Sequence, residues 1–190
     1  RRKLSFDESL TVALRVADGL AVAHRHNVVH RDVKPSNLFL PAGDVARVKL
    51  LDFGIARRAD ERFRVTRHGV RVGTPSFMAP EQVRADETVD GRADLFSLGC
   101  VLYWCLSGRP PFSGDPMAVA VKIMEEDPEP LARLCPSLPG PLVDLVARML
   151  AKDPARRPAD AAALAAELRA LLDRPSCLPP TTATLSAEER

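Results

Sequence analysis

The chain has 190 residues, of which 46% are apolar and 27% are charged. This composition is typical of a folded globular domain and excludes a fibrous or intrinsically disordered chain. The formal net charge is only +2, so bulk electrostatics predicts neither nucleic acid nor a membrane surface as a partner.

The first predicted element is a helix from Phe6 to His26. Ser5 and Glu8, three residues apart, form a capping-box pattern at its start. His24 and His26 fall at the negative end of the helix dipole, where we interpret them as structural rather than catalytic or metal-binding. One helical face is marked by Leu10, Leu14, Ala17, Ala21 and His24.

A short antiparallel hairpin is predicted next. Two apolar runs, residues 38–40 and 48–51, are separated by the turn residues Pro41, Gly43 and Asp44. Residues 54–78 are rich in arginine and follow no clear period, so we expect a long loop. A loop of this length inside a compact domain is usually functional.

The rest of the chain is predicted to be helical up to a polar tail. The expected helices are residues 90–107, 117–126, 142–150 and 160–172. The first of them is strongly apolar and ends at Gly108, which predicts a buried central helix. Residues 173–190 contain prolines and hydroxyl side chains without an apolar period, as is typical of a flexible tail or linker.

The cysteines and the apolar runs predict no metal site and no membrane segment. The longest nearly apolar run, residues 95–106, is too short to cross a bilayer. The cysteines lack metal-ligand spacing, so we expect reduced thiols in a cytoplasmic protein. They are Cys100, Cys105, Cys135 and Cys177.

The hairpin is expected to bring two oxygen-bearing side chains together. If Leu40 pairs with Lys49, then Asn37 faces Asp52 across the strands. An amide oxygen and a carboxylate suit a hard cation such as Mg²⁺, which also takes phosphate oxygens.

The loop before the hairpin adds a base and a cation. Asp32 lies five residues before Asn37, within reach of the same space, and Lys34 supplies a point charge suited to a phosphate. A carboxylate, a metal pair and a cation together are typical of phosphoryl transfer, in which positioning and charge neutralisation do most of the catalysis.

Three motifs in the expected order carry a family resemblance. They read HRDVKPSN at residues 30–37, DFG at 52–54 and APE at 79–81, and they resemble the eukaryotic-type (Hanks-type) protein kinases, most closely the bacterial Ser/Thr branch. Val33 replaces the leucine of the usual motif. The resemblance covers residues 4–172 and includes Gly73–Pro75, Asp94–Gly99 and Asp153–Pro158.

The resemblance implies a set of catalytic roles. Asp32 would accept or orient the substrate hydroxyl proton, and Lys34 would contact the transferred phosphate of ATP. Asn37 and Asp52 would hold Mg²⁺. Thr74 would form a hydrogen bond near Asp32 and Lys34 and favour Ser/Thr substrates.

The resemblance also implies structural roles. His30 and Phe53 would stack behind the site, and Asp94 would brace the backbone of the catalytic loop. Glu81 and Arg157 would form a partly buried ion pair, whose loss would destabilise the lobe.

The arginine-rich segment leaves two interpretations open. It is either a solvated basic loop or a segment in which phosphorylated Thr66 is clamped by Arg31 and its neighbours.

The motifs of the small N-terminal β lobe of these kinases are missing. Residues 1–29 contain one glycine, Gly19, and one lysine, Lys3, so neither a glycine-rich loop nor the strand lysine is present. We therefore expect residues 1–172 to form a C-terminal lobe alone, mainly α, with a helical bundle around a central apolar helix and a hairpin at the active-site edge. Apolar surface around Phe53 and His30 should be exposed, where the missing lobe would pack.

The expected function is ATP- and Mg²⁺-dependent phosphorylation of serine and threonine in a protein substrate, with little activity without an N-terminal lobe as partner. The alternative is a degenerate kinase-like module that binds partners without catalysis. A small-molecule kinase of the aminoglycoside type ranks last, because Gly73–Pro75 and Asp94–Gly99 fit protein kinases better.

Overall fold

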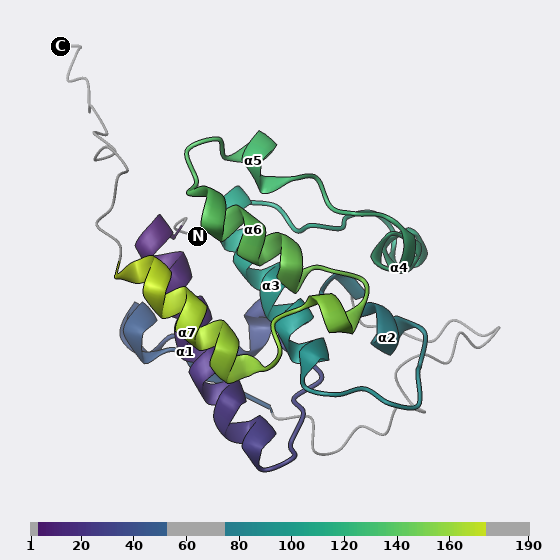
Figure 1. Ribbon diagram of the computed structural model, residues 1–190, viewed down its shortest axis with the longest axis horizontal. Coiled ribbons are helices and arrows are strands. Elements are labelled where there is room, and N and C mark those ends of the chain that lie inside the picture. The colour runs from purple at the N-terminus through teal and green to yellow at the C-terminus, as the bar shows by residue number, and fades with distance from the viewer. Residues whose placement is uncertain (1–3, 53–74, 174–190) are drawn as a thin grey trace.

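The computed structural model describes residues 4–52 and 75–173, which form a helical lobe with a two-stranded sheet at one edge (Figure 1). Its α-helices and strands are α1 (Phe6–Arg25), β1 (Leu38–Phe39), β2 (Lys49–Leu50), α2 (Pro80–Val83), α3 (Arg92–Ser107), α4 (Pro116–Glu125), α5 (Leu131–Leu134), α6 (Gly140–Met149) and α7 (Ala161–Leu172). Single 3₁₀ turns lie at Pro35–Asn37, Pro41–Gly43, Val45–Arg47, Pro75–Phe77 and Pro154–Arg156. The mainly helical fold predicted from the sequence is confirmed.

Helix α1 begins at the predicted cap. The Ser5 hydroxyl accepts a hydrogen bond from the Glu8 N–H, and the Glu8 carboxylate accepts one from the Ser5 N–H. The predicted apolar face is buried, including Leu10 and Ala17 at 0% exposure. This face packs against α3 and α7, and α7 runs alongside α1 in Figure 1.

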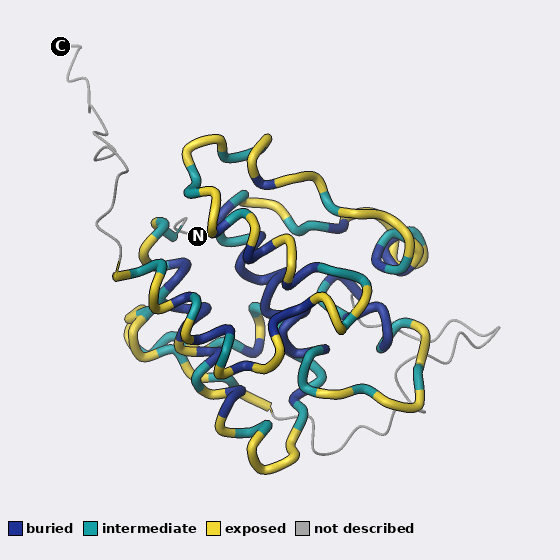
Figure 2. Tube along the Cα trace, viewed as in Figure 1, coloured by how far each residue is buried: buried dark blue, intermediate teal, exposed yellow. Residues whose placement is uncertain are grey.

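Helix α3 is the centre of the lobe. It is buried on nearly all sides, as its continuous apolar sequence predicts (Figure 2). It packs against α1 on one side and α6 on another. At Gly99 a Cβ atom would lie 2.9 Å from the Met149 Cβ, so a glycine is needed where α3 and α6 approach each other. Gly108, with φ of 80°, ends the helix in the left-handed conformation that glycine adopts without strain.

Several boundaries differ from the predictions by one or two residues. Helices α3 and α7 begin later than predicted because capping side chains lie outside the helices they start, whereas α4 and α6 begin one and two residues earlier than predicted. Asp90 accepts a hydrogen bond from the Arg92 N–H and so precedes α3. Asp115 and Asp160 cap α4 and α7 in the same way. The short helices α2 and α5 were not predicted, although Pro80 at the first position of α2 is a recognisable start signal.

A buried ion pair ties α2 to the segment after α6. Both guanidinium Nη atoms of Arg157 donate to the Glu81 carboxylate, at 2.6 and 2.9 Å, and the two side chains are 0% and 5% exposed. Arg157 also donates to backbone carbonyls of Ala151, Lys152 and Arg92. The predicted pair is therefore present, and it is more deeply buried than expected.

Candidate active site

The loop between α1 and β1 rests on one buried carboxylate. Asp94, at the start of α3 and 0% exposed, accepts hydrogen bonds from the His30 N–H at 2.8 Å and the Arg31 N–H at 2.7 Å. These bonds confirm the predicted brace. The carbonyl of Arg31 accepts a further bond from Gln82 on α2 at 2.9 Å. Arg31 has a left-handed φ of 64°, an unfavourable conformation that contacts on both sides of the residue hold in place.

The sequence did not reveal that His24 also contacts Asp94. The His24 Nε2 lies 2.8 Å from Asp94 Oδ2, and since a carboxylate only accepts, Nε2 carries the hydrogen. The structural interpretation of His24 is therefore confirmed, but its partner is 70 residues away in the chain. No local pattern reports such a contact.

His30 connects the loop to the hairpin. Its Nε2 donates to the Leu51 carbonyl at 2.9 Å, and its Nδ1 accepts from the Asp32 N–H at 3.2 Å. Both bonds require the same neutral tautomer, with the hydrogen on Nε2. His30 itself is 0% exposed, and the exposed apolar surface expected around Phe53 and His30 stays a prediction, because Phe53 lies outside the described residues. The exposed apolar side chains at this edge are Phe39 and Leu51 on the hairpin.

Three of the predicted site residues converge. Lys34 Nζ donates to Asp32 Oδ2 at 2.9 Å, and Asn37 Nδ2 donates to the same oxygen at 3.2 Å and to the Asp32 carbonyl at 2.8 Å. Asn37 is buried, whereas the side chains of Lys34 and Asp32 are about one-third exposed (35% and 31%). Within the described residues, Asp32 Oδ1 accepts no hydrogen bond, which leaves this oxygen open to a substrate hydroxyl.

The hairpin register differs from the prediction by one residue. Leu38 pairs with Leu50, and the Leu51 N–H donates to the Asn37 carbonyl at 2.8 Å, so Asn37 faces Leu51 rather than Asp52. Two-residue strands leave the register to the connection, which contains two 3₁₀ turns and a left-handed Ala42 with φ of 53°. The predicted register assumes a simple turn between the strands, and a simple turn gives a register that differs by one residue from the observed one.

Asp52 lies two residues after the end of β2. It is exposed and has a left-handed φ of 54°, and the preceding Leu51 carbonyl is bonded to His30. No hydrogen bond joins Asp52 to Asn37 within the described residues. The convergence of Asp52 with the other three residues therefore stays a prediction.

The oxygen atoms of Asn37 and Asp52 are chemically suited to bind the predicted Mg²⁺. With its Nδ2 directed at Asp32, Asn37 has an amide oxygen free to bind a cation, and Asp52 offers carboxylate oxygens. These are hard ligands of the kind that Mg²⁺ takes together with phosphates. In the described part of the chain, no group of three or more His, Cys, Asp or Glu side chains could hold a metal.

Some predictions fall outside the described residues. They concern Phe53, the hydrogen bond of Thr74, phosphorylation of Thr66, and the flexible tail. Cys100, Cys105 and Cys135 are free thiols, as expected, and burial raises the pKa of Cys100 and Cys105. No helix in the described ranges has the length and apolar character needed to span a bilayer.

The catalytic-loop geometry and the helical lobe beneath it define the class of protein. The family model described as a protein kinase domain matches residues 1–168. The chain belongs to the protein kinase family.

Its relatives include named bacterial serine/threonine-protein kinases. The chain is 42% identical over 162 residues to PknB of Mycolicibacterium smegmatis, and this alignment covers 84% of the chain and 25% of the relative. It is 41% identical over 166 residues to Pkn1 of Myxococcus xanthus, covering 86% of this chain and 24% of the relative. A probable serine/threonine-protein kinase of Streptomyces coelicolor is 37% identical over 174 residues, covering 90% and 25%. The chain thus spans about a quarter of the length of these relatives.

Proposed function

We propose that this lobe catalyses transfer of the γ-phosphoryl group of ATP to serine and threonine hydroxyls of a protein substrate. The observation that carries the proposal is the cluster of Asp32, Lys34 and Asn37 on a loop whose backbone is bonded to Asp94. The relatives are named serine/threonine-protein kinases, which supports serine and threonine as acceptors.

In the proposed reaction, Asp32 Oδ1 accepts a hydrogen bond from the substrate hydroxyl and orients its oxygen toward the γ-phosphorus. The new O–P bond forms as the bond to the β-phosphate oxygen breaks, ADP leaves, and the hydroxyl proton passes to Asp32 Oδ1. Lys34 lies beside Asp32 and balances charge on the transferred group. Mg²⁺, bound by Asn37 and Asp52, would neutralise charge on the phosphates.

The bonds to Asn37 and Asp94 give the loop its preorganisation. Asn37 grips both the backbone carbonyl and the carboxylate of Asp32, so the base has little freedom to rotate away from the substrate. Asp94 fixes the two residues that precede Asp32. A correctly placed base avoids reorganisation during the reaction.

The test supplies the glycine-rich loop and the strand lysine that residues 1–29 lack. The nucleotide-binding lobe of PknB from Mycolicibacterium smegmatis is fused before Arg1, and phosphate transfer from ATP to a peptide mixture is followed. We expect phosphoserine and phosphothreonine that require both Mg²⁺ and ATP. The Lys49→Gln variant, changed at an exposed site on β2, should react like the unchanged fusion. A folded fusion that binds ATP but transfers no phosphate would favour the binding-module alternative.

A further inference from the structure

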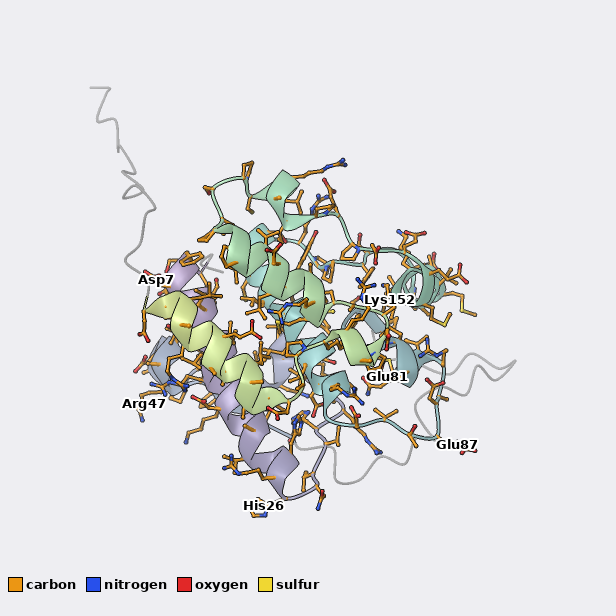
Figure 3. The ribbon with its side chains drawn as sticks, in the orientation of Figure 1. Asp7, His26, Arg47, Glu81, Glu87 and Lys152 are labelled. Atoms are coloured by element: carbon orange, nitrogen blue, oxygen red, sulfur yellow. The ribbon has the colours of Figure 1, made fainter. Side chains whose placement is uncertain are left out.

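Gln82 follows Glu81 on α2 (Figure 3) and joins the catalytic loop to the start of its own helix. Its Nε2 donates to the Arg31 carbonyl at 2.9 Å, although 51 residues separate the two in the chain. Its Oε1 accepts a hydrogen bond from the Ala79 N–H at 3.1 Å. Because the Ala79 N–H only donates and the Arg31 carbonyl only accepts, both contacts require the same orientation of the side-chain amide. The amide of Gln82 is therefore held at both ends.

The carbonyl that Gln82 binds belongs to the peptide group directly before the proposed base. At the other end of this peptide, the Asp32 N–H donates to His30 Nδ1 at 3.2 Å. Arg31 has a left-handed φ of 64°, a conformation that a residue with a side chain keeps only where the surrounding structure holds it. A rotation of the peptide would release Arg31 from this conformation and shift the Asp32 carboxylate. The bond from Gln82 opposes that rotation.

Gln82 reaches the loop from a different direction than the other two side chains that hold its backbone. Asp94 on α3 accepts from two N–H groups before the base, and Asn37 donates to the carbonyl of the base itself. Gln82 binds the carbonyl between these two sets of bonds. Its helix is fixed in turn, since the neighbouring Glu81 is paired with Arg157 at 2.6 and 2.9 Å.

We propose that Gln82 is a positioning residue for phosphoryl transfer, acting on Asp32 through the Arg31 carbonyl. This inference rests on the proposed function. A displacement of a catalytic group by about 1 Å can cost up to about 10²-fold in rate. Loss of the donor at Gln82 should therefore lower kcat and leave the KM for peptide nearly unchanged, because the misplaced base weakens the transition state rather than peptide binding.

Two variants separate the two hydrogen bonds of Gln82 in the fused kinase. Gln82→Glu keeps an acceptor for the Ala79 N–H, but its carboxylate cannot donate to the Arg31 carbonyl at a pH well above the pKa of a glutamate. Its kcat should fall roughly tenfold, the effect of one lost hydrogen bond. Gln82→Lys supplies a donor for the Arg31 carbonyl and no acceptor for Ala79, and its kcat should stay within about threefold of the unchanged fusion.

The control adds the same carboxylate elsewhere. Thr88→Glu lies at an exposed position next to Glu87, at the edge of the lobe (Figure 3), and should leave kcat unchanged. All rates are compared at equal folded fraction. If Gln82 only stabilised α2, the loss of the Ala79 bond would make Gln82→Lys the impaired variant and Gln82→Glu the active one. The two roles therefore predict opposite orders of kcat.

A second measurement needs no kinase activity. In the ¹⁵N-labelled 190-residue chain, the Asp32 amide proton should exchange with solvent roughly tenfold faster in Gln82→Glu and at the unchanged rate in Gln82→Lys, with the amide protons of α7 as the internal reference. A fusion without phosphate transfer would count against the proposed function, and the exchange rates would then decide on Gln82 alone. An unchanged kcat of Gln82→Glu in an active fusion, or unchanged exchange at Asp32, would overturn the inference.

Discussion

Two buried carboxylates hold this lobe together in different ways. Asp94 lies under the catalytic loop and accepts two backbone N–H groups and the His24 ring N–H. Glu81 lies at α2 and is matched by the two-pronged guanidinium of Arg157. The Asp94 carboxylate shapes the backbone beside Asp32, whereas the Glu81 carboxylate joins α2 to Arg157, which lies 76 residues later in the chain. The difference predicts that changes at Asp94 affect catalysis and changes at Arg157 affect stability.

The largest effect on stability is expected at Arg157. Arg157→Ala leaves the Glu81 charge buried without its partner, and the free energy of unfolding should fall by about 3–5 kcal/mol. Arg148→Ala is the matched control, because Arg148 pairs with Glu167 at the surface. It should cost less than about 1 kcal/mol. Urea unfolding followed by circular dichroism measures both, and similar losses for the two variants would contradict the assignment.

The second effect is expected at Asp94. Asp94→Asn keeps the shape but turns an amide NH₂ toward N–H donors, so the free energy of unfolding should fall by roughly 1.5–3 kcal/mol. At temperatures where this variant is folded, the kcat of the fused kinase should fall while the KM for peptide changes little. If KM rose and kcat stayed the same, Asp94 would not be positioning the catalytic loop.

A smaller effect is expected at His24. His24→Leu removes one of the donors to Asp94, and the free energy of unfolding should fall by about 1 kcal/mol. His26→Leu changes the exposed histidine two residues later and serves as the control. Thermal denaturation of the two variants distinguishes them. Equal melting temperatures would show that the bond from His24 adds no stability.

The smallest effect concerns pH and Asp90. Its hydrogen bond with Arg92 is the main reason that the pKa of Asp90 lies below its usual range. A carboxyl whose pKa is lower in the folded state stabilises the fold above its unfolded pKa, and this stabilisation is lost as the pH falls through the folded pKa. Asp90→Asn should therefore flatten the loss of stability below about pH 4. Melting curves at several acidic pH values test this, and an unchanged slope would count against it.

Elements with a local signal were predictable from the sequence. The start of α1 depends on Ser5 and Glu8, and the end of α3 depends on Gly108, so adjacent residues carry the information. The cluster of Asp32, Lys34 and Asn37 was also predictable, since these residues lie within six positions of one another and match a known motif.

The errors have a common physical origin. The hairpin register depends on the backbone of Ala42, whose left-handed conformation its residue type does not announce. The contact of His24 with Asp94 and that of Gln82 with Arg31 join distant parts of the chain.

The central claim is that Asp32 is the base beside which a phosphoryl group is transferred. The most direct test is the single-turnover rate of peptide phosphorylation by the fused chain, with Asp32→Asn compared with the unchanged residue at equal folded fraction. We predict a loss of about 10²–10⁴-fold, the contribution typical of a positioned general base. An Asp32→Asn variant that transfers phosphate at the unchanged rate would contradict the account.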